Sequence, residues 1–327
     1  MTKPKIAVVT GGTSSELEIS LQSAKIINEN LDKNKFDTYI VVLEAQNWYV
    51  VENNTHLPID KNDFSYTNDK DEKIVPDCVF TAIHGTPGED GKLQGYFDLL
   101  SIPYTNGGVL SSSLTFHKFA CKNYMKPFEV VKMANDIELI KGQEIDIDKI
   151  IATVGLPCFV KPSLSGSSCG ISKVKQKSEL QDAINKAFVE SNDVIIEQFI
   201  QGIELTSGVL KTKNATVLLP VTEVVSHKEF FDYEAKYNAS LSDEITPARI
   251  SEADTLRCQQ TSSKIYDILK CSGVVRVDYI LSGNDLYFLE INTVPGMAAN
   301  SIIPKQVRTA GLKLTDFYTQ MIEDKLV

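Results

Sequence analysis

Residues 273–304 read GVVRVDYILSGNDLYFLEINTVPGMAANSIIP, and this stretch decides the expected fold. It holds two runs of β-branched and aromatic residues on either side of the turn-forming tetrapeptide Ser282-Gly283-Asn284-Asp285, a pattern that predicts a β-hairpin. Side chains two residues apart in a strand share one face of it. One face of the hairpin is therefore expected to be apolar and to carry Val275, Val277, Tyr279, Tyr287, Leu289 and Ile291.

The opposite face of the hairpin is expected to be charged. Arg276 and Asp278 project together from the first strand, and Phe288, Glu290 and Asn292 project from the second. Charged groups buried without partners cost several kcal/mol, so this face should open onto water, a metal or a ligand. Two carboxylates and an amide oxygen suit a hard cation, which predicts a site for Mg²⁺ and a nucleotide. The alternative is a structural ion pair between Arg276 and a carboxylate.

The composition is that of an ordinary globular protein, with 43% hydrophobic and 23% charged residues in 327. This length predicts two or three domains. The net charge of −10, from 33 Lys and Arg against 43 Asp and Glu, argues against nucleic-acid and anionic-membrane binding. The first apolar run ends in Gly-Gly and is better explained as a strand than as a signal peptide, and no run is long enough to span a membrane. We expect a cytoplasmic protein.

The cysteines and histidines do not form a metal or disulfide pattern. Six cysteines are scattered without C-x-x-C spacing, which predicts free thiols in a reducing compartment. The four histidines include no H-E-x-x-H motif, so hydrolysis by a transition metal is not expected.

The first third of the chain predicts a small doubly wound domain that ends near residue 105. A buried strand over residues 5–10 leads through a glycine turn into apolar residues at helical spacing from Leu17 onward. Glu16, at the start of that helix, either caps it through a capping box or faces a ligand. Further strands are expected at residues 36–43 and 78–85. His84 ends the second of these, where open α/β sheets bind ligands.

The middle of the chain predicts a second domain with a phosphate-binding loop. Residues 127–148 are acidic and are expected to be irregular. A strand over residues 155–162 then ends in Lys161-Pro162, and SLSGSSCG follows at 163–170. Glycine and small hydroxyl residues let backbone N–H groups approach an anion, so this loop is a candidate lid over phosphates. The alternative is a flexible loop without a ligand.

Two later segments carry further candidates. Glu197 and Glu204 flank a turn at Gln201-Gly202, where a carboxylate either meets a nucleotide ribose or is simply solvated. The run FFDYEAKYNA at 230–239 predicts an ordered, functional loop. Helices are expected at 253–270 and 304–326.

Five motifs now stand in order: GGTSSELE, AIHGTPGEDGKLQG, VKPSLSGSSCGI, YEAKY, and RVDYI followed by LEINTVPGM. The ordered set resembles the D-alanine–D-alanine ligase family of the ATP-grasp superfamily of carboxylate–amine ligases, over nearly the whole chain. The resemblance implies a mixed α/β fold with three domains. These are an N-terminal α/β substrate domain (1–106), a central ATP-grasp lid domain (107–200), and a C-terminal ATP-grasp domain with the magnesium and substrate sites (201–327).

The resemblance also implies roles for residues that match the family motifs. The ATP ligands it implies are Lys118 and Lys161 at the phosphates, Ser168 with Gly166 and Ser167 in the lid, Lys236 beside the phosphate, Glu197 near adenine and Glu204 at the ribose. The magnesium ligands it implies are Asp278, Glu290 and Asn292, with Mn²⁺ as an alternative metal. The D-alanine ligands it implies are Glu16 and His84 for the first molecule, and Gly296, Ser301 and Ile302 for the second. Tyr237 and Ser167 match a hydrogen-bonded set with Glu16, and Arg276 matches the residue that stabilises an oxyanion.

The reaction implied is ligation of two D-alanines through an acyl-phosphate, with ATP consumed, for peptidoglycan precursors. The nearest alternative is a D-alanine–D-lactate ligase, against which Tyr237 argues because that branch differs at this position. Another ATP-grasp ligase and a catalytically inactive nucleotide-binding module are more distant alternatives. Homodimers are common in the family, so a homodimer is expected from the resemblance alone.

Overall fold

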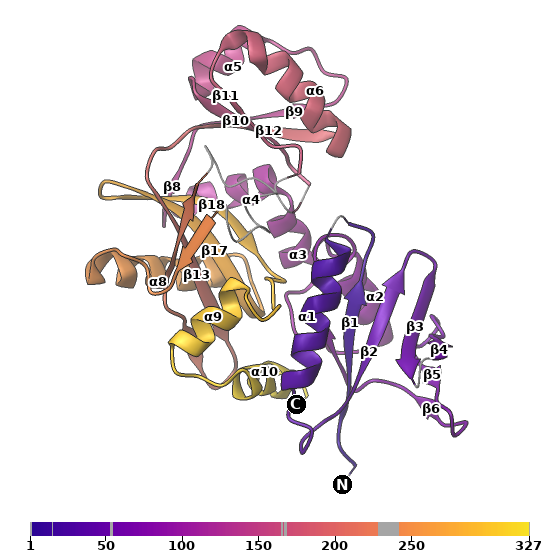
Figure 1. Ribbon diagram of the computed structural model, residues 1–327. Coiled ribbons are helices and arrows are strands. Elements are labelled where there is room, and N and C mark those ends of the chain that lie inside the picture. The colour runs from indigo at the N-terminus through magenta and orange to yellow at the C-terminus, as the bar shows by residue number, and fades with distance from the viewer. Residues whose placement is uncertain are drawn as a thin grey trace.

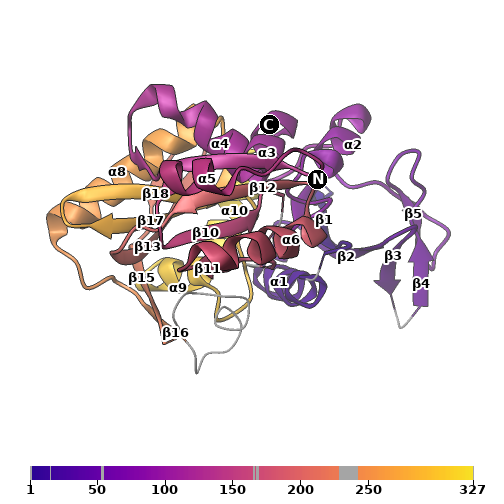
Figure 2. The same cartoon turned by 90° about the horizontal axis from the view of Figure 1, so that it is seen from above.

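The described residues form three large β-sheets, each with its own helices, and one two-stranded pair (Figure 1). The structure is a computed structural model that describes residues 2–14, 16–52, 55–164, 166, 169–227 and 242–326. The mixed α/β fold class predicted from the sequence is confirmed. In the view from above, the N-terminal sheet and the C-terminal sheet lie on opposite sides of the molecule, and the strands of the central sheet lie over the region where the two meet (Figure 2). The domain limits at residues 106 and 200 stay a prediction. None of the described helices has the length and apolar character needed to cross a membrane.

The N-terminal sheet has the order β4-β3-β2-β1-β7 and is doubly wound around β1. Its strands are β1 (Lys5–Gly11), β2 (Asp37–Glu44), β3 (Asn47–Glu52), β4 (Thr55–Pro58) and β7 (Cys78–Thr81). β1 pairs in parallel with β2 and β7, so both faces of β1 are buried. Ile6 and Val8 face α1 (Leu17–Asn30), whereas Ala7 and Val9 share a core with α2 (Lys92–Leu100). A small side pair consists of β5 (Tyr66–Thr67) and β6 (Lys73–Ile74).

The central sheet is antiparallel, with the order β11-β10-β12-β9. Its strands are β9 (Asp136–Ile140), β10 (Cys158–Pro162), β11 (Ser172–Val174) and β12 (Asp193–Gln198). Its helices are α5 (Ile147–Val154), the short η2 (Lys177–Glu179) and α6 (Leu180–Glu190). α5 and α6 cover one face, where Val160 and Ile196 join their core (Figure 1). Because side chains alternate along a strand, Lys161 and Glu197 project from the other face.

The C-terminal sheet has the order β16-β15-β13-β17-β18-β8, and β14 pairs with β13. Its strands are β8 (Lys132–Met133), β13 (Ile203–Lys211), β14 (Thr216–Leu218), β15 (Thr222–Ser226), β16 (Ser242–Ile245), β17 (Gly273–Ser282) and β18 (Asp285–Asn292). The helices packed on or beside it are α3 (Val109–Phe116), α4 (Lys118–Met125), η1 (Lys126–Phe128) and α8 (Glu252–Ile268). α8 and α4 bury Cys258 and Cys121 in one core against Val275 of β17.

The last two helices join the C-terminal part to the N-terminal sheet. The expected helix over residues 304–326 is two helices, α9 (Ile302–Thr309) and α10 (Leu314–Glu323), because Gly311 adopts a φ of +73° that ends a helix. Phe317 and Met321 of α10 share a core with Ile6 and Val8 of β1. The first and last parts of the chain therefore form one packed unit.

The hairpin of β17 and β18 forms as predicted, but its faces differ from the prediction. Asp278 pairs with Glu290, whereas the next residue, Tyr279, pairs with Phe288. Leu289 is thus an extra residue, a β-bulge that shifts the alternation along β18. As a result Phe288 is buried in the core beside Tyr279, and Tyr287 and Leu289 are only partly buried. The placement of Phe288 on the charged face was wrong, and so was that of Tyr287 and Leu289 in the core.

The acidic segment at 127–148 is also more regular than expected. It contains β8 and β9, and β9 forms an edge of the central sheet through its pairing with β12. The alternating Ile137 and Leu139 of β9 pack in the core under the helices. Asp136 pairs directly with Glu197 across the two strands, so the two carboxylates project from the same face.

Candidate active site

One large cleft, of about 1580 Å³, is lined by residues of α1 and the loop after β7 in the N-terminal part, and by residues of the central and C-terminal sheets. Every predicted site residue that the structure describes lies along it: Glu16, His84, Lys118, Lys161, Glu197, Glu204, Arg276, Asp278, Glu290, Asn292, Gly296, Ser301 and Ile302. Gly166 of the proposed lid also lines it. The other predicted site residues, Ser167, Ser168, Lys236 and Tyr237, lie outside the described residues. Their predicted roles, and those of the lining residues, rest on the resemblance.

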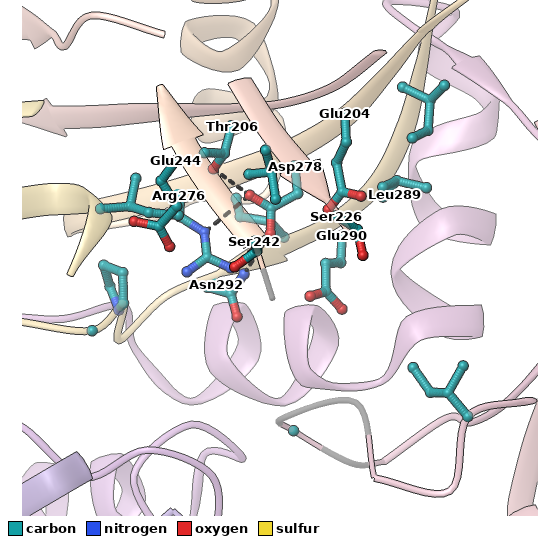
Figure 3. Close-up of a pocket in the computed structure, with 18 of the residues that line it drawn as sticks. Glu204, Thr206, Ser226, Ser242, Glu244, Arg276, Asp278, Leu289, Glu290 and Asn292 are labelled. Carbon is teal, nitrogen blue, oxygen red and sulfur yellow. Dashed lines mark hydrogen bonds and ion pairs between the residues drawn. The ribbon is translucent and has the colours of Figure 1, made fainter. Parts of the chain in front are cut away.

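Asp278 of β17 is the centre of a hydrogen-bonded set on the floor of the cleft (Figure 3). Arg276 donates to it through Nε at 2.9 Å and Nη2 at 2.7 Å. Thr206 donates its hydroxyl to Oδ1, and Asn292 donates Nδ2 to Oδ2 at 3.2 Å. The ion pair that the sequence left as an alternative does form, and it also faces the cleft.

Arg276 keeps its charge despite being largely shielded from water. Burial alone would lower the pKa of Arg276, but Asp278, then Glu290 and Glu244, raise it above its ordinary value. Because Nε and Nη2 face Asp278, Nη1 is the guanidinium nitrogen that remains for a substrate oxygen. A fixed cation of this kind can stabilise negative charge that develops during a reaction.

Negative charge is concentrated beside this set. Glu290 projects into the cleft (Figure 3). Lys118 of α4 lies 3.2 Å from its Oε2. Burial raises the pKa of the Glu204 carboxyl to about 7, helped by the charges of Asp278 and Glu290. Burial is the larger cause of this shift, and the two carboxylates add to it. The carboxylates of Glu204, Asp278 and Glu290 all line the cleft, and such oxygens suit a hard cation.

The raised pKa of Glu204 predicts a pH-dependent stability. The folded state binds a proton more tightly than the unfolded state, so this group stabilises the protein fully below pH 4.5 and loses that contribution as the pH rises through about 7. Between pH 4.5 and pH 8 the wild type should lose about 1–2 kcal/mol of unfolding free energy that Glu204→Gln does not lose, after allowance for screening. Denaturant unfolding of both proteins across this range measures it. Glu144→Gln changes an exposed carboxylate and should follow the wild type at every pH; a parallel profile for Glu204→Gln would contradict the assignment.

Two lysines, one from the central sheet and one from α4, surround one carboxylate of the central sheet. Lys161 of β10 lies 2.7 Å from Glu197 Oε2, and Lys122 of α4 hydrogen-bonds Oε1 of the same carboxylate. Burial would raise the pKa of Glu197, but Lys122 and then Lys161 hold it far below its usual range. Lys122 and its other partner, Asp136, were not predicted from the sequence. The repeated lysines at helical spacing in α4, Lys118 and Lys122, are the pattern that could have indicated it.

His84 joins the N-terminal sheet to the loop after β18. Its Nδ1 lies 2.8 Å from the carbonyl oxygen of Val294, which can only accept, so Nδ1 carries a proton. Its Nε2 lies 3.0 Å from Ser23 Oγ of α1, and Ser23 Oγ also accepts the N–H of Met297 at 3.2 Å. These bonds hold the loop that contains Gly296 against the N-terminal sheet. Ser23 was missed, although serines at helical spacing on an apolar helix face, Ser20 and Ser23, mark a buried polar contact.

The Ser23 contacts predict a change in substrate affinity. Ser23→Ala removes a hydrogen bond to His84 and one to Met297, so the loop with Gly296 should lose its fixed position. We expect the KM for the substrate to rise about tenfold and the free energy of unfolding to fall by about 1–3 kcal/mol. Steady-state kinetics and denaturant unfolding measure the two effects.

Ser262→Ala is the matched control, because Ser262 is another fully buried serine whose hydroxyl bonds Tyr279 in the core under α8. It should lower stability and leave the KM unchanged. An unchanged KM in Ser23→Ala would show that the His84 contacts serve stability alone.

Glu16 lies where the N-terminal and central parts of the cleft meet. It is the N-cap residue of α1, but its side chain makes no capping hydrogen bond among the described residues. The alternative role of Glu16 as a helix cap is therefore not supported. A Cβ placed on Gly166 would collide with the Glu16 carboxylate, so Gly166 of the proposed lid lies directly against it. Glycine at 166 permits this close approach.

The far end of the cleft is formed by the turn before α9. Ser301 is the N-cap residue of α9, and a Cβ on Gly296 would lie 3.0 Å from its Oγ. This places Gly296, Ser301 and Ile302 together beside the helix N-terminus. Backbone N–H groups at a helix N-terminus favour a negatively charged group such as a carboxylate.

Comparisons with known proteins agree with this arrangement. The family model described as D-ala D-ala ligase N-terminus matches residues 5–107, and the one described as D-ala D-ala ligase C-terminus matches residues 125–323. The D-alanine–D-alanine ligase of Bacteroides fragilis is 51% identical over 325 residues, 99% of this chain and 99% of that protein. That of Flavobacterium johnsoniae is 46% identical over 319 residues, 97% of this chain and 98% of that protein.

Two solved structures show the same fold. The VanG D-Ala:D-Ser ligase of Enterococcus faecalis has a TM-score of 0.88 at 32% identity and covers 100% of both chains. The Bacillus anthracis D-alanine–D-alanine ligase complexed with ATP has a TM-score of 0.79 at 30% identity, over 99% of this chain and 97% of that one. Fold and relatives together define an ATP-dependent ligase with the ATP-grasp fold. Within that class, the chain belongs to the D-alanine–D-alanine ligase family. The resemblance inferred from the five motifs is confirmed.

Proposed function

We propose that the cleft joins two D-alanines to D-alanyl-D-alanine through an acyl-phosphate, the activity named for its relatives, in the synthesis of peptidoglycan precursors. The observation that carries the proposal is the meeting of three walls in one cleft. These walls are His84 from the loop after β7, Lys161 from the central sheet, and the Arg276–Asp278 pair from the C-terminal sheet.

ATP lies between the central and C-terminal sheets in this proposal. Lys118 and Lys161 bind its phosphates, Glu197 lies near the adenine, and Glu204 accepts from the ribose hydroxyls. The position of all four along one cleft supports this placement. The fold shared with a ligase complexed with ATP supports it as well.

Asp278, Glu290 and Asn292 are the proposed ligands for Mg²⁺, with Mn²⁺ as a substitute. Their donor atoms fit, since Asp278 and Glu290 are paired across β17 and β18 and Asn292 lies within hydrogen-bond distance of Asp278, which brings carboxylate and amide oxygens together. Four donors already surround Asp278, so we expect the longest bond, from Asn292, to give way to the cation. The metal would supply charge neutralisation at the phosphates.

Phosphoryl transfer needs positioning and charge neutralisation more than covalent help. The first D-alanine binds near Glu16 and His84, and its carboxylate oxygen forms a bond to the γ-phosphorus while the bond to ADP breaks. Lys161 and Arg276 neutralise charge on the transferred group. A carboxylate, a poor electrophile, thereby becomes a reactive acyl-phosphate.

The second D-alanine then attacks with its amine. Gly296, Ser301 and Ile302 hold it, with its carboxylate toward the N-terminus of α9. The nitrogen bonds to the acyl carbon, phosphate leaves, and a proton is released. Arg276 stabilises the oxyanion between these events. Water would destroy the acyl-phosphate, so the proposal includes closure of the loop with Ser167 and Ser168 and the loop with Lys236 and Tyr237.

The setting of the reaction is also proposed. The six cysteines are free, which suits the reducing cytoplasm. A homodimer is proposed from the family alone. D-Alanine and ATP are the proposed small-molecule partners.

Phosphate release with ATP, Mg²⁺ and D-alanine, with mass detection of the product, tests the function. D-Alanine alone is compared with D-alanine plus D-lactate and with D-alanine plus D-serine, because a D-Ala:D-Ser ligase shares the fold. D-Alanyl-D-alanine as the main product supports the proposal. A depsipeptide or a mixed dipeptide as the main product would replace it.

A further inference from the structure

A buried cluster of charges surrounds Glu197, the partner of the proposed phosphate lysine Lys161. Lys122 of α4 has a side chain only 1% exposed. Its ammonium hydrogen-bonds Glu197 of β12 and lies 3.3 Å from Asp136 Oδ2 of β9. Lys161 takes the other oxygen of Glu197 at 2.7 Å, and Lys126 takes the other oxygen of Asp136 at 2.9 Å.

The strand register explains why a cation is needed there. Asp136 and Glu197 are direct partners in the antiparallel β9–β12 pair, so their carboxylates point from the same face of the sheet. Like charges opposite each other on neighbouring strands repel. Lys122 reaches them from α4, which packs against the C-terminal sheet through Cys121 and Met125. It therefore neutralises the pair and links the central sheet to the C-terminal one.

Glu197 also affects how Lys161 can be used. In this structure Lys161 is paired with Glu197, and burial would lower the pKa of Lys161 but Glu197 raises it. To bind a phosphate, the Lys161 ammonium must either bind Glu197 and the phosphate together or move away from Glu197. If it moved away, the Glu197 carboxylate would be buried without a counter-charge, which is unfavourable unless another cation remains beside it.

We propose that Lys122 is a positioning residue that keeps Glu197 neutralised, so that Lys161 can turn from Glu197 to the phosphates of the nucleotide. The inference rests on the proposed ATP site. It assigns Lys122 no contact with the nucleotide. Its effect should therefore depend on the phosphates of the ligand and leave recognition of the nucleoside intact.

Lys122→Met tests this by calorimetric titration with ATP, ADP and adenosine. In the variant Lys161 is the remaining partner of Glu197 and is held there, so affinity for ATP and ADP should fall about tenfold or more. Adenosine has no phosphate, and its affinity should change less than about threefold. Lys126→Met is the matched control: it removes the other lysine of Asp136, which is 41% exposed, and should leave all three affinities within about threefold.

Two double variants complete the test. Lys122→Met with Glu197→Gln removes the charge that holds Lys161, and the ratio of ATP affinity to adenosine affinity should return toward the wild-type value. Lys122→Met with Asp136→Asn also lacks Lys122 but carries one fewer buried carboxylate, and it provides the same titration if the single variant does not fold.

Each outcome decides a different point. Equal losses for ATP and adenosine, or no loss for either, would overturn the role of Lys122. Failure of the Glu197→Gln double variant to restore the ratio would overturn the route through Glu197. Absence of ATP binding by the wild type would instead reject the proposed nucleotide site.

Discussion

Asp278→Asn is expected to lower the rate of dipeptide formation by about 10²–10³-fold. The substitution keeps the shape of the side chain but removes the charge that holds Arg276 through two bonds of 2.9 and 2.7 Å. It also removes a carboxylate from the proposed magnesium site. Turnover at saturating ATP and D-alanine, measured over a range of Mg²⁺ concentrations, should show both a lower maximum and a higher Mg²⁺ requirement.

Asp285→Asn is the control for this experiment. Asp285 lies at the other end of the same hairpin and pairs with Lys132, but its side chain is 43% exposed. Turnover and Mg²⁺ dependence should stay at wild-type values, because exposed ion pairs contribute little. If Asp278→Asn behaved like Asp285→Asn, the floor of the cleft would not be the reacting site.

Arg276→Met is expected to have the second large effect. The oxyanion loses its fixed cation, which should lower kcat by about 10²–10³-fold. Asp278, only 11% exposed, also loses its counter-charge, so the free energy of unfolding should fall by about 3 kcal/mol. Arg276→Lys keeps the charge but cannot form the bidentate pair with Asp278. It should therefore restore most of the free energy of unfolding but little of kcat.

Arg257→Met provides the comparison, because Arg257 pairs with Asp254 on α8 at 2.7 Å and is 38% exposed. Both kcat and stability should change little in that variant. Single-turnover kinetics separate the rate of the chemical step from the rate of product release. A kcat for Arg276→Met within about threefold of the wild type would remove Arg276 from the chemistry.

Much of the hairpin could be predicted from its sequence, and the part that could not has a physical cause. The alternation of Val275, Arg276, Val277 and Asp278 gives the two faces of β17 correctly. The same reasoning fails along β18, because Leu289 is a bulge residue with no partner on β17. Leucine is an ordinary strand residue, so its side chain gives no sign of the bulge.

The candidate site likewise contains residues that could be assigned from the sequence and residues that could not. Residues in motifs, such as Glu16 and Lys161, could be assigned to one site because the order of the motifs resembles a family. Lys122 and Asp136 were not assigned. The spacing of Lys118 and Lys122 indicates a shared helix face, but a lysine in an amphipathic helix and an aspartate in an acidic segment both suggest solvated surface. The pairing of β9 with β12 places Asp136 beside Glu197, where Lys122 meets both carboxylates.

The packing of α10 against β1 has a consequence for how the chain is made. Translation produces β1 well before α10, yet Phe80 beside β1 meets the ring of Tyr318 at 5.6 Å between centroids. One face of the first sheet thus has no complete cover until α10 has been made. Until then that apolar face is exposed to other nascent chains and to chaperones, and the N-terminal sheet reaches its final stability only after α10 has packed on it.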